Sequence, residues 1–288
     1  MMKSIQLKAH AKVNLALDII GKRSDGYHEV RMIMQSIGLH DQLSIYITND
    51  SKIRVQTNLP FLPTNQSNIV YKAASLIKRK FQLDQGLYIN LNKRIPVSAG
   101  LAGGSTDAAA TLHGLNQLFD LKLSLKELMD IGVELGADVP FCLLGGTALS
   151  EGIGEKLTPL HPFPPCHILV VNPNFNVPTK NIYRQLNLNH IKKRTNIDDL
   201  IKNIKEDNLH GATKNFSNVL ETVTVKNHPL IQEIKDKMME LGAITSIMSG
   251  SGPTVFGIYD DLGKAKEAFY HFKVDNFEYQ VFLTKPYS

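Results

Sequence analysis

The sequence has 288 residues, of which 43% are hydrophobic and 20% are charged. That balance is typical of a soluble globular protein and excludes an intrinsically disordered chain. The chain is long enough for one large domain or two ordinary ones. No apolar run is long enough to span a bilayer, and the first residues contain no apolar signal-peptide core, so we expect a cytoplasmic protein.

The formal net charge of +5 suits an anionic partner, whether a nucleotide, a diphosphate or a nucleic acid, without choosing among them. The two cysteines, Cys142 and Cys166, are too few for a disulfide framework and lack the spacing of metal ligands. This use of cysteine predicts a reducing compartment and no structural zinc.

The first 60 residues have the character of β-strands. Apolar side chains alternate with polar or small ones over residues 13–19, which predicts a strand with one buried face. The pattern continues over residues 43–47 and 53–55, and residues 24–26 have the composition of a turn.

Helical spacing of apolar residues follows from Ile69 to Phe81, and then a short strand is predicted over 87–91. A second helix is expected from Ser105 to Phe119. Ser124 and Glu127 have the spacing of a capping box and predict the start of a third helix.

Three prolines in residues 160–165 mark the candidate domain boundary, which divides the chain into residues 1–160 and 161–288. Beyond it the pattern predicts a buried strand over 167–171 and a strand-turn-strand unit around 248–253. Helices are expected near 196–206, 229–241 and 262–272, with a last strand near 279–284. Mixed helices and adjacent strands predict an α+β fold in two lobes.

A glycine-rich loop at residues 96–106 precedes the helix that we expect from Ser105. Small residues let the backbone approach a ligand closely, and the helix N-terminus offers free N–H groups, so the loop favours an anion. A flexible loop capped by Ser105 is the alternative interpretation. A second glycine cluster at residues 249–252, able to close over the first, favours the phosphate site. The sequence contains neither G-x-x-x-x-G-K-[ST] nor the dinucleotide motif G-x-G-x-x-G, so the common nucleotide folds are not supported.

Three segments resemble the signatures of the GHMP kinases: AKVNL at 11–15, PVSAGLAGGSTDAAA at 96–110 and MSGSGPTVF at 248–256. Three more, KRSDGYHE at 22–29, GADVPF at 136–141 and EGIGE at 151–155, narrow the resemblance to members that act on a cytidine-diphosphate-linked methylerythritol. The resemblance covers nearly the whole chain. It implies the two-lobed α+β GHMP kinase fold, with an N-terminal lobe resembling domain 2 of ribosomal protein S5.

The resemblance implies transfer of the γ-phosphoryl group of ATP, with Mg²⁺, to the 2-hydroxyl of 4-diphosphocytidyl-2-C-methyl-D-erythritol in non-mevalonate isoprenoid synthesis. We expect a monomer or weak homodimer with no nucleic-acid or membrane partner. Asp138 and Lys12 match the catalytic pair. A positioned carboxylate can accept the hydroxyl proton, and a lysine can keep it ionised and offset charge on the transferring group. Without the other motifs, a strand-end surface lysine would be the favoured interpretation of Lys12, and a helix N-cap that of Asp138.

On the substrate side, Tyr27 and His28 match a cytosine-recognising pair, because an aromatic ring stacks on a base and an imidazole gives directional hydrogen bonds. Asn14, Thr179 and Tyr183 match further substrate contacts. Ser105 or Thr106 is the expected Mg²⁺ ligand. The nucleotide-side residues implied by the resemblance are Asn68, Lys93, Pro96, Val97, Ser98, Ala99, Gly100, Leu101, Ala102, Gly103, Gly104, Ser105 and Thr106.

His10, Ala102 and Thr106 depart from the family pattern, in which proline, glycine and serine are usual. Alanine still allows a tight loop if its φ is negative. Two alternatives stay open. One is another GHMP kinase acting on mevalonate derivatives, homoserine or a sugar, which the Tyr27–His28 pair disfavours. The other is a non-catalytic relative. An RNA binder is disfavoured because the sequence lacks the interleaved aromatic and basic residues that single-strand binders use. A degenerate kinase that only binds nucleotide is disfavoured because Lys12 and Asp138 are both present.

Overall fold

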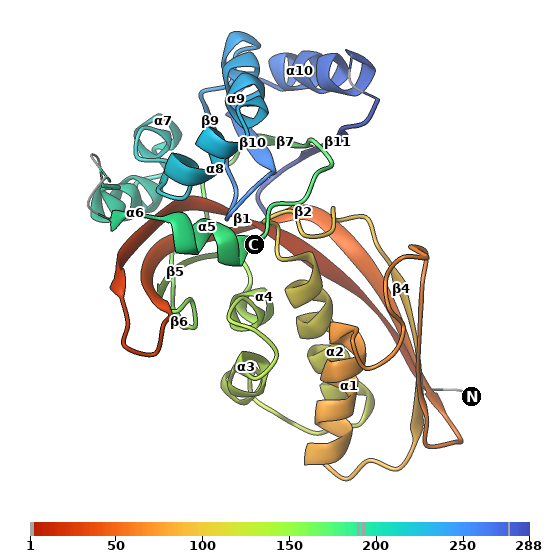
Figure 1. Ribbon diagram of the computed structural model, residues 1–288. Helices are drawn as coiled ribbons and strands as arrows, with labels where there is room; N and C mark the ends of the chain where they lie inside the picture. The colour runs from red at the N-terminus through yellow and green to blue at the C-terminus, as the bar shows by residue number, and fades with distance from the viewer. Residues whose placement is uncertain (1–2, 189–190, 192–193, 276) are drawn as a thin grey trace. The chain divides into compact units, whose positions relative to one another are not determined.

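The computed structural model describes residues 3–188, 191, 194–275 and 277–288. Helices and sheets are mixed (Figure 1), so the α+β prediction is confirmed. Two compact units make up the chain, as a two-lobed fold predicts. The first unit contains the residues up to Ala11, Leu39–Val97 and Ala102–Leu144, and the second contains Lys12–Gly38, Ser98–Leu101 and Gly145–Ser288. The domain boundary at 160/161 and the likeness to the ribosomal-protein domain stay predictions.

Seven of the described strands form one sheet built around two long strands, β1 (Ser4–Lys22) and β2 (His28–Thr48). The strand order is β3-β4-β2-β1-β8, and β5 pairs with both β2 and β6. The turn expected at residues 24–26 joins β1 to β2. The remaining strands are β3 (Ile53–Thr57), β4 (Gly86–Asn92), β5 (Thr147–Gly152), β6 (Lys156–Pro159) and β8 (Ser217–Asn218).

The prediction of one buried face over residues 13–19 is wrong, because β1 is buried on both faces there. Asn14 is 0% exposed and Asp18 is 4% exposed. Both polar side chains are paired: Asn14 accepts a hydrogen bond from Lys12, and Asp18 accepts one from Arg194. Buried polar groups of this kind are stable only when their hydrogen bonds are made. This strand therefore contributes paired polar side chains as well as apolar packing.

In the first unit, helices α1 (Ile69–Lys80) and α2 (Gly103–Leu118) lie side by side (Figure 1) and pack with β4 in one hydrophobic core. The Asn68 side chain caps α1 by accepting a hydrogen bond from Val70 N. The expected capping box of Ser124 and Glu127 is confirmed at the start of α3 (Leu125–Val133). The short helix α4 (Val139–Leu144) follows directly after Asp138.

In the second unit, four antiparallel strands form a separate sheet of order β11-β7-β10-β9. The bounds are β7 (His167–Asn172), β9 (Thr245–Met248), β10 (Val255–Tyr259) and β11 (Gln280–Thr284). Every residue of β10 is buried, as expected for a central strand. The helices are α5 (Thr179–Gln185), α6 (Ile197–Lys205), α7 (Leu209–Thr213), α8 (Glu221–Asn227), α9 (Leu230–Glu240) and α10 (Leu262–Asp275).

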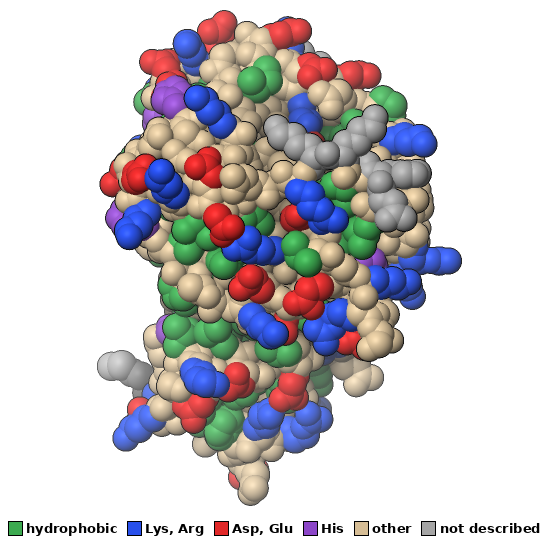
Figure 2. Space-filling model, turned by 90° about the vertical axis from the view of Figure 1, so that its left-hand side faces the viewer, with side chains coloured by type: hydrophobic (Ala, Val, Ile, Leu, Met, Phe, Trp, Pro, Cys, Tyr) green, Lys and Arg blue, Asp and Glu red, His purple; other side chains and the backbone are tan. Residues whose placement is uncertain are grey.

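Charged side chains of both signs are interspersed over the molecular face shown in Figure 2. The net charge of +5 is therefore not gathered there into one positive patch. None of the helices in the described part of the chain has the length and apolar character that crossing a membrane requires.

Candidate active site

The glycine-rich loop has an unusual backbone, with positive φ values at Ser98 (55°), Gly100 (76°) and Ala102 (55°). Ala102 therefore does not have the negative φ with which alanine fits a tight loop without strain. A left-handed alanine costs about 1–2 kcal/mol, because its Cβ crowds the following carbonyl oxygen, and the surrounding packing must offset that cost.

Helix α2 begins at Gly103, two residues before the expected start at Ser105. Its N-cap residue is Ala102, which offers no side-chain hydrogen bond, so Ser105 is not the cap. The first N–H groups of a helix have no partner within the helix. Without a side-chain cap, this helix end is suited to bind an anion.

The second glycine cluster meets the first, as the sequence analysis suggested. The Ser249 hydroxyl donates a hydrogen bond of 2.9 Å to the carbonyl oxygen of Gly100. A Cβ atom added at Gly100 would lie 3.1 Å from the carbonyl carbon of Ser249 and closer still to its oxygen. A Cβ atom added at Gly250 would lie 3.3 Å from the Gly100 Cα. Only glycine allows two backbones to approach this closely.

Lys12 and Asn14 lie beside the contact between the two glycine clusters, within the second unit. The Lys12 Nζ donates a hydrogen bond of 2.8 Å to the Asn14 Oδ1, since residues two apart in a strand share a face. The Lys12 backbone N–H also donates to the carbonyl oxygen of Leu101, at 3.1 Å. Lys12 is only 5% exposed, so it is not a surface lysine. All three GHMP-like signatures therefore contribute residues to this one region: Lys12 and Asn14, Gly100 and Leu101, and Ser249 and Gly250.

Lys93 is part of a buried charge cluster in the first unit. Its Nζ lies 2.7 Å from an oxygen of Asp107 and also donates to Asp41, and all three side chains are buried. Burial lowers the pKa of Lys93, but the two carboxylates outweigh it, so the net shift is upward. Burial, with the nearby Asp41, raises the pKa of the Asp107 carboxyl well above its usual range. The Asp107 Oδ1 has no hydrogen-bond partner among the described residues.

This cluster underlies the start of helix α2, because a Cβ atom at Gly103 would lie 3.2 Å from the Lys93 Nζ. The Asp41 Oδ1 also accepts hydrogen bonds from the backbone N–H groups of Arg94 and Ile95. Asp41 thus fixes the chain just before the glycine-rich loop. Asp41 and Asp107 could not be predicted from the sequence, since 52 and 14 residues separate them from Lys93 and no local pattern links them.

The N-terminus of α1 lies beside that of α2, because a Cβ atom at Gly104 would be 3.6 Å from the Ile69 Cγ2. Asn68 uses its side chain to cap α1 and to donate to the carbonyl oxygen of Pro63. Ser105 is partly exposed at this point, whereas Thr106 is 2% exposed. Two helix N-termini that lie side by side favour negative charge.

Asp138 is half-buried at the start of α4, where its carbonyl oxygen accepts a hydrogen bond from Cys142 N. This is the backbone position of a helix N-cap. Asp138 belongs to the first unit and Lys12 to the second, and their action as a catalytic pair stays a prediction.

The residues expected to bind the substrate include two rings that the structure brings together. The rings of His28 and Tyr183 lie with their centroids 5.2 Å apart. Burial, with a smaller contribution from Lys22, lowers the pKa of His28. Its imidazole is therefore neutral near pH 7 and can both donate and accept. Tyr27 is 61% exposed, and Thr179 shares a hydrogen bond of 2.7 Å with the Ser251 hydroxyl.

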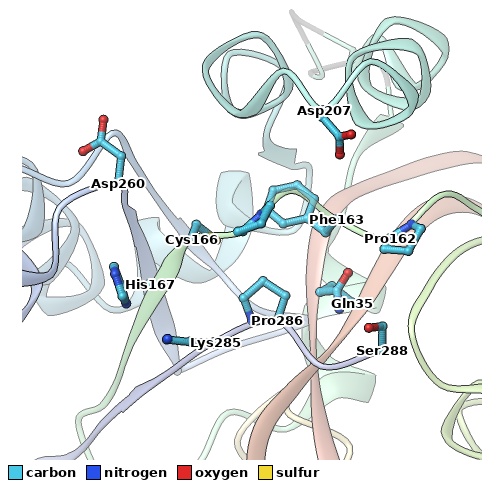
Figure 3. Close-up of a pocket in the computed structure, with 11 residues that line it drawn as sticks. Gln35, Pro162, Phe163, Cys166, His167, Asp207, Asp260, Lys285, Pro286 and Ser288 are labelled. Carbon is cyan, nitrogen blue, oxygen red and sulfur yellow. The ribbon is translucent and has the colours of Figure 1, made fainter.

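A separate cavity of about 630 Å³ lies in the second unit (Figure 3). Its lining includes Gln35, Phe163, Cys166, Lys285 and Pro286, and none of the residues expected at the active site. Burial raises the pKa of the Cys166 thiol to about 12, so this thiol is not a nucleophile near neutral pH. This cavity therefore carries no part of the expected chemistry.

Comparison with known proteins identifies the class of protein to which this chain belongs. A family model described as GHMP kinases N terminal domain matches residues 68–146, and one described as GHMP kinases C terminal matches residues 193–273. Together with the fold, these matches define the class as the GHMP kinases. A solved homoserine kinase from Cytophaga hutchinsonii shares the fold over 99% of this chain and 95% of its own, with a TM-score of 0.76 at 19% identity.

Relatives with higher sequence identity identify the family within that class. A 4-diphosphocytidyl-2-C-methyl-D-erythritol kinase from Lachnoclostridium phytofermentans is 56% identical over 99% of this chain and 98% of its own length. One from Alkaliphilus metalliredigens is 52% identical over 93% and 92%. A crystal structure of 4-(cytidine 5'-diphospho)-2C-methyl-D-erythritol kinase has a TM-score of 0.85 at 31% identity, covering 99% of this chain and 100% of its own. The chain belongs to the 4-diphosphocytidyl-2-C-methyl-D-erythritol kinase family.

Proposed function

We propose that this chain transfers the γ-phosphoryl group of ATP to the 2-hydroxyl of 4-diphosphocytidyl-2-C-methyl-D-erythritol, in the non-mevalonate route to isoprenoid precursors. The observation that carries the proposal is the 56% identity, over nearly the full length of both chains, to a relative named for that substrate. The junction of Lys12, Asn14, Gly100 and Ser249 supports it, because it joins the three signatures of a phosphoryl-transfer site.

Asp138 accepts the proton of the attacking hydroxyl in this proposal, and Lys12 offsets the charge of the transferring group. The burial of Lys12 supports its role, since a buried ammonium interacts more strongly with charge than an exposed one. Asn14 fixes the Lys12 ammonium through their hydrogen bond of 2.8 Å. A general base contributes roughly 10²–10⁴-fold to such a reaction, and positioning and electrostatics supply most of the rest.

The loop from Pro96 to Thr106 cradles the ATP phosphates, and the uncapped N-terminus of α2 supports this role. The Lys93 ammonium already serves two carboxylates, so it has one remaining hydrogen to offer a nucleotide. Asn68 acts through its cap of α1, which fixes the neighbouring helix end.

Mg²⁺ would bind the nucleotide phosphates and neutralise part of their charge. The described residues contain no group of three or more His, Cys, Asp or Glu side chains able to hold a metal ion by themselves. A site with few protein ligands fits Mg²⁺, because Mg²⁺ keeps several waters and binds mainly through substrate phosphates with one or two protein oxygens. Ser105 is the better candidate ligand than Thr106, because it is the more exposed of the two hydroxyls.

His28 and Tyr27 recognise the cytosine, with Tyr183 and Thr179 beside them. A neutral His28 imidazole, held against the Tyr183 ring, can donate to one cytosine edge atom and accept from another. The exposed ring of Tyr27 offers a stacking face. The enzyme acts in the cytoplasm as a monomer or weak homodimer, without a nucleic-acid partner, in the same proposal.

The experiment is a measurement of ADP release with ATP, Mg²⁺ and one acceptor at a time. We expect rapid release with the cytidine diphosphate substrate and background release with mevalonate, homoserine, galactose or no acceptor. Faster release with mevalonate or homoserine would place the chain in another branch of the GHMP kinases. Background release with every acceptor would favour a relative that binds nucleotide without transferring phosphate.

A further inference from the structure

The second glycine cluster, residues 249–252, is hydrogen-bonded by residues 218–224, a segment with no recognisable motif. The Asn218 side chain, 4% exposed, donates hydrogen bonds to the carbonyl oxygens of Met248 (2.8 Å) and Gly250 (2.7 Å). These two carbonyl groups flank Ser249, whose hydroxyl donates to Gly100. The Asn218 Oδ1 accepts from Leu220 N at 3.0 Å, which fixes which end of the amide faces the loop.

Two neighbours of Asn218 hold the same loop at other points. The Glu221 Oε1 accepts a hydrogen bond of 2.7 Å from Met248 N, and its other oxygen pairs with Lys235 at 2.7 Å. The Thr224 hydroxyl donates to the carbonyl oxygen of Ser251, at 3.2 Å. Residues 218–224 thus bind the backbone in and next to the second cluster at three residues, Met248, Gly250 and Ser251, through three carbonyl groups and one N–H group.

We infer that Asn218 is a positioning residue for phosphoryl transfer, which sets the phosphate loop through Ser249 and Gly100. The inference rests on the proposed function. Asn218 spans Ser249 with two hydrogen bonds, and Ser249 in turn fixes the Gly100 carbonyl group in the loop proposed to bind ATP. Reaction rates depend steeply on such placement, because a shift of about 1 Å in a reacting group can cost about 10²-fold.

Asparagine is the side chain that this place requires. An aspartate has the same shape, but its oxygens cannot donate and would face the carbonyl oxygens of Met248 and Gly250. A matched control exists in Asn116, whose side chain donates to the carbonyl oxygen of Leu123 and accepts from its N–H, both at 3.0 Å. Asn116 joins two backbone segments in the same way without touching either glycine cluster.

The test compares Asn218→Asp, Asn218→Ala and the control Asn116→Asp below the melting temperature of each protein. We expect both Asn218 variants to lose at least about tenfold in kcat/KM for ATP and in the ADP association constant measured by calorimetry. The Asn116 variant keeps wild-type values. A cycle with Ser249→Ala adds a readout that a purely structural role would not move: the effects of Asn218→Ala and Ser249→Ala on kcat/KM are non-additive, because one acts through the other.

Values within twofold of wild type for folded Asn218 variants, or additive effects in the cycle, would overturn the inference. Failure of both Asn218 variants to fold while the Asn116 variant folds would also overturn it, since Asn218 would then serve folding alone. If the wild-type protein phosphorylates no cytidine substrate, the proposed function fails, and the ADP affinities of the same variants still decide the role of Asn218.

Discussion

Gly100 and Ser249 lie so close that no side chain larger than hydrogen fits at Gly100. Its φ of +76° is left-handed, and an added Cβ atom would collide with the Ser249 carbonyl group. Gly100→Ala therefore combines backbone strain with a clash that pushes the two glycine clusters apart. We expect kcat/KM for ATP to fall at least about tenfold, measured by ADP release.

Gly145→Ala is the matched control for this change. Gly145 has a similar φ of +70°, but nothing lies within 4 Å of its Cβ position. It should lose about 1–2 kcal/mol of unfolding free energy through strain alone and keep full activity. An equal loss of activity in both variants would show that strain, and not the contact of Gly100 with Ser249, controls the loop.

Asp138→Asn tests the proposed base. Asparagine is as good an N-cap as aspartate, so helix α4 should keep its start while the proton acceptor is lost. We expect kcat to fall by at least about 10²-fold, while the affinity for ATP, measured by calorimetry, stays near its wild-type value. Asp130→Asn, an exposed aspartate on α3, is the control and should behave as wild type. Near-normal turnover of Asp138→Asn would remove Asp138 from the mechanism.

Much of the local structure can be predicted from the sequence, because its causes are local. The spacing of apolar residues from Ile69 predicts α1, and Ser124 with Glu127 predicts the start of α3, where both halves of the capping box form. The signatures around Lys12, Gly100 and Ser249 predict residues that the structure then brings together.

The rest depends on contacts between distant parts of the chain. The left-handed φ of Ala102 contradicts the intrinsic preference of alanine, so only the folded surroundings can impose it. Asp41 lies on β2, Lys93 just after β4 and Asp107 on α2, and Asn218 reaches a loop 30 residues away. A single sequence contains no periodicity or short motif that links such positions.

Asp107→Asn tests the buried charge cluster through the pH dependence of stability. A carboxyl group with a raised pKa in the folded protein binds its proton more tightly there than in the unfolded chain. Stability is therefore lost as the pH rises from the unfolded pKa of about 3.9 through the folded one. The variant lacks this loss, so its unfolding free energy should rise relative to wild type between pH 4 and pH 8, measured by urea unfolding.

Asp41→Ala is the contrasting change in the same cluster. It removes a partner of Lys93 and the acceptor for two backbone N–H groups, so we expect a loss of about 3–5 kcal/mol at pH 7. If Asp107→Asn is as destabilising as Asp41→Ala and the difference from wild type does not change with pH, Asp107 is an ordinary ionised partner of Lys93.

The cytosine contacts can be separated by two variants. His28→Ala should shrink the preference for the cytidine substrate over its uridine analogue. In the wild-type protein, uracil would present donor and acceptor in exchanged positions and leave buried polar groups unpaired, and each unpaired group costs about 1–3 kcal/mol. Tyr27→Ala should weaken both substrates alike, by about 1–3 kcal/mol of stacking. Tyr270→Ala is the control, since Tyr270 is 62% exposed against 61% for Tyr27. An unchanged preference in His28→Ala would exclude His28 as the reader of the base.

The central claim, phosphoryl transfer to the 2-hydroxyl of a cytidine-diphosphate-linked methylerythritol, is tested most directly by identifying the product. The wild-type protein is incubated with ATP, Mg²⁺ and an equal mixture of the cytidine substrate and its uridine analogue, and the products are followed by ³¹P NMR. We predict one new phosphomonoester signal, on the 2-hydroxyl of the cytidine compound, together with an equal amount of ADP. Equal phosphorylation of both compounds, transfer to another hydroxyl, or ADP without a phosphomonoester would contradict it.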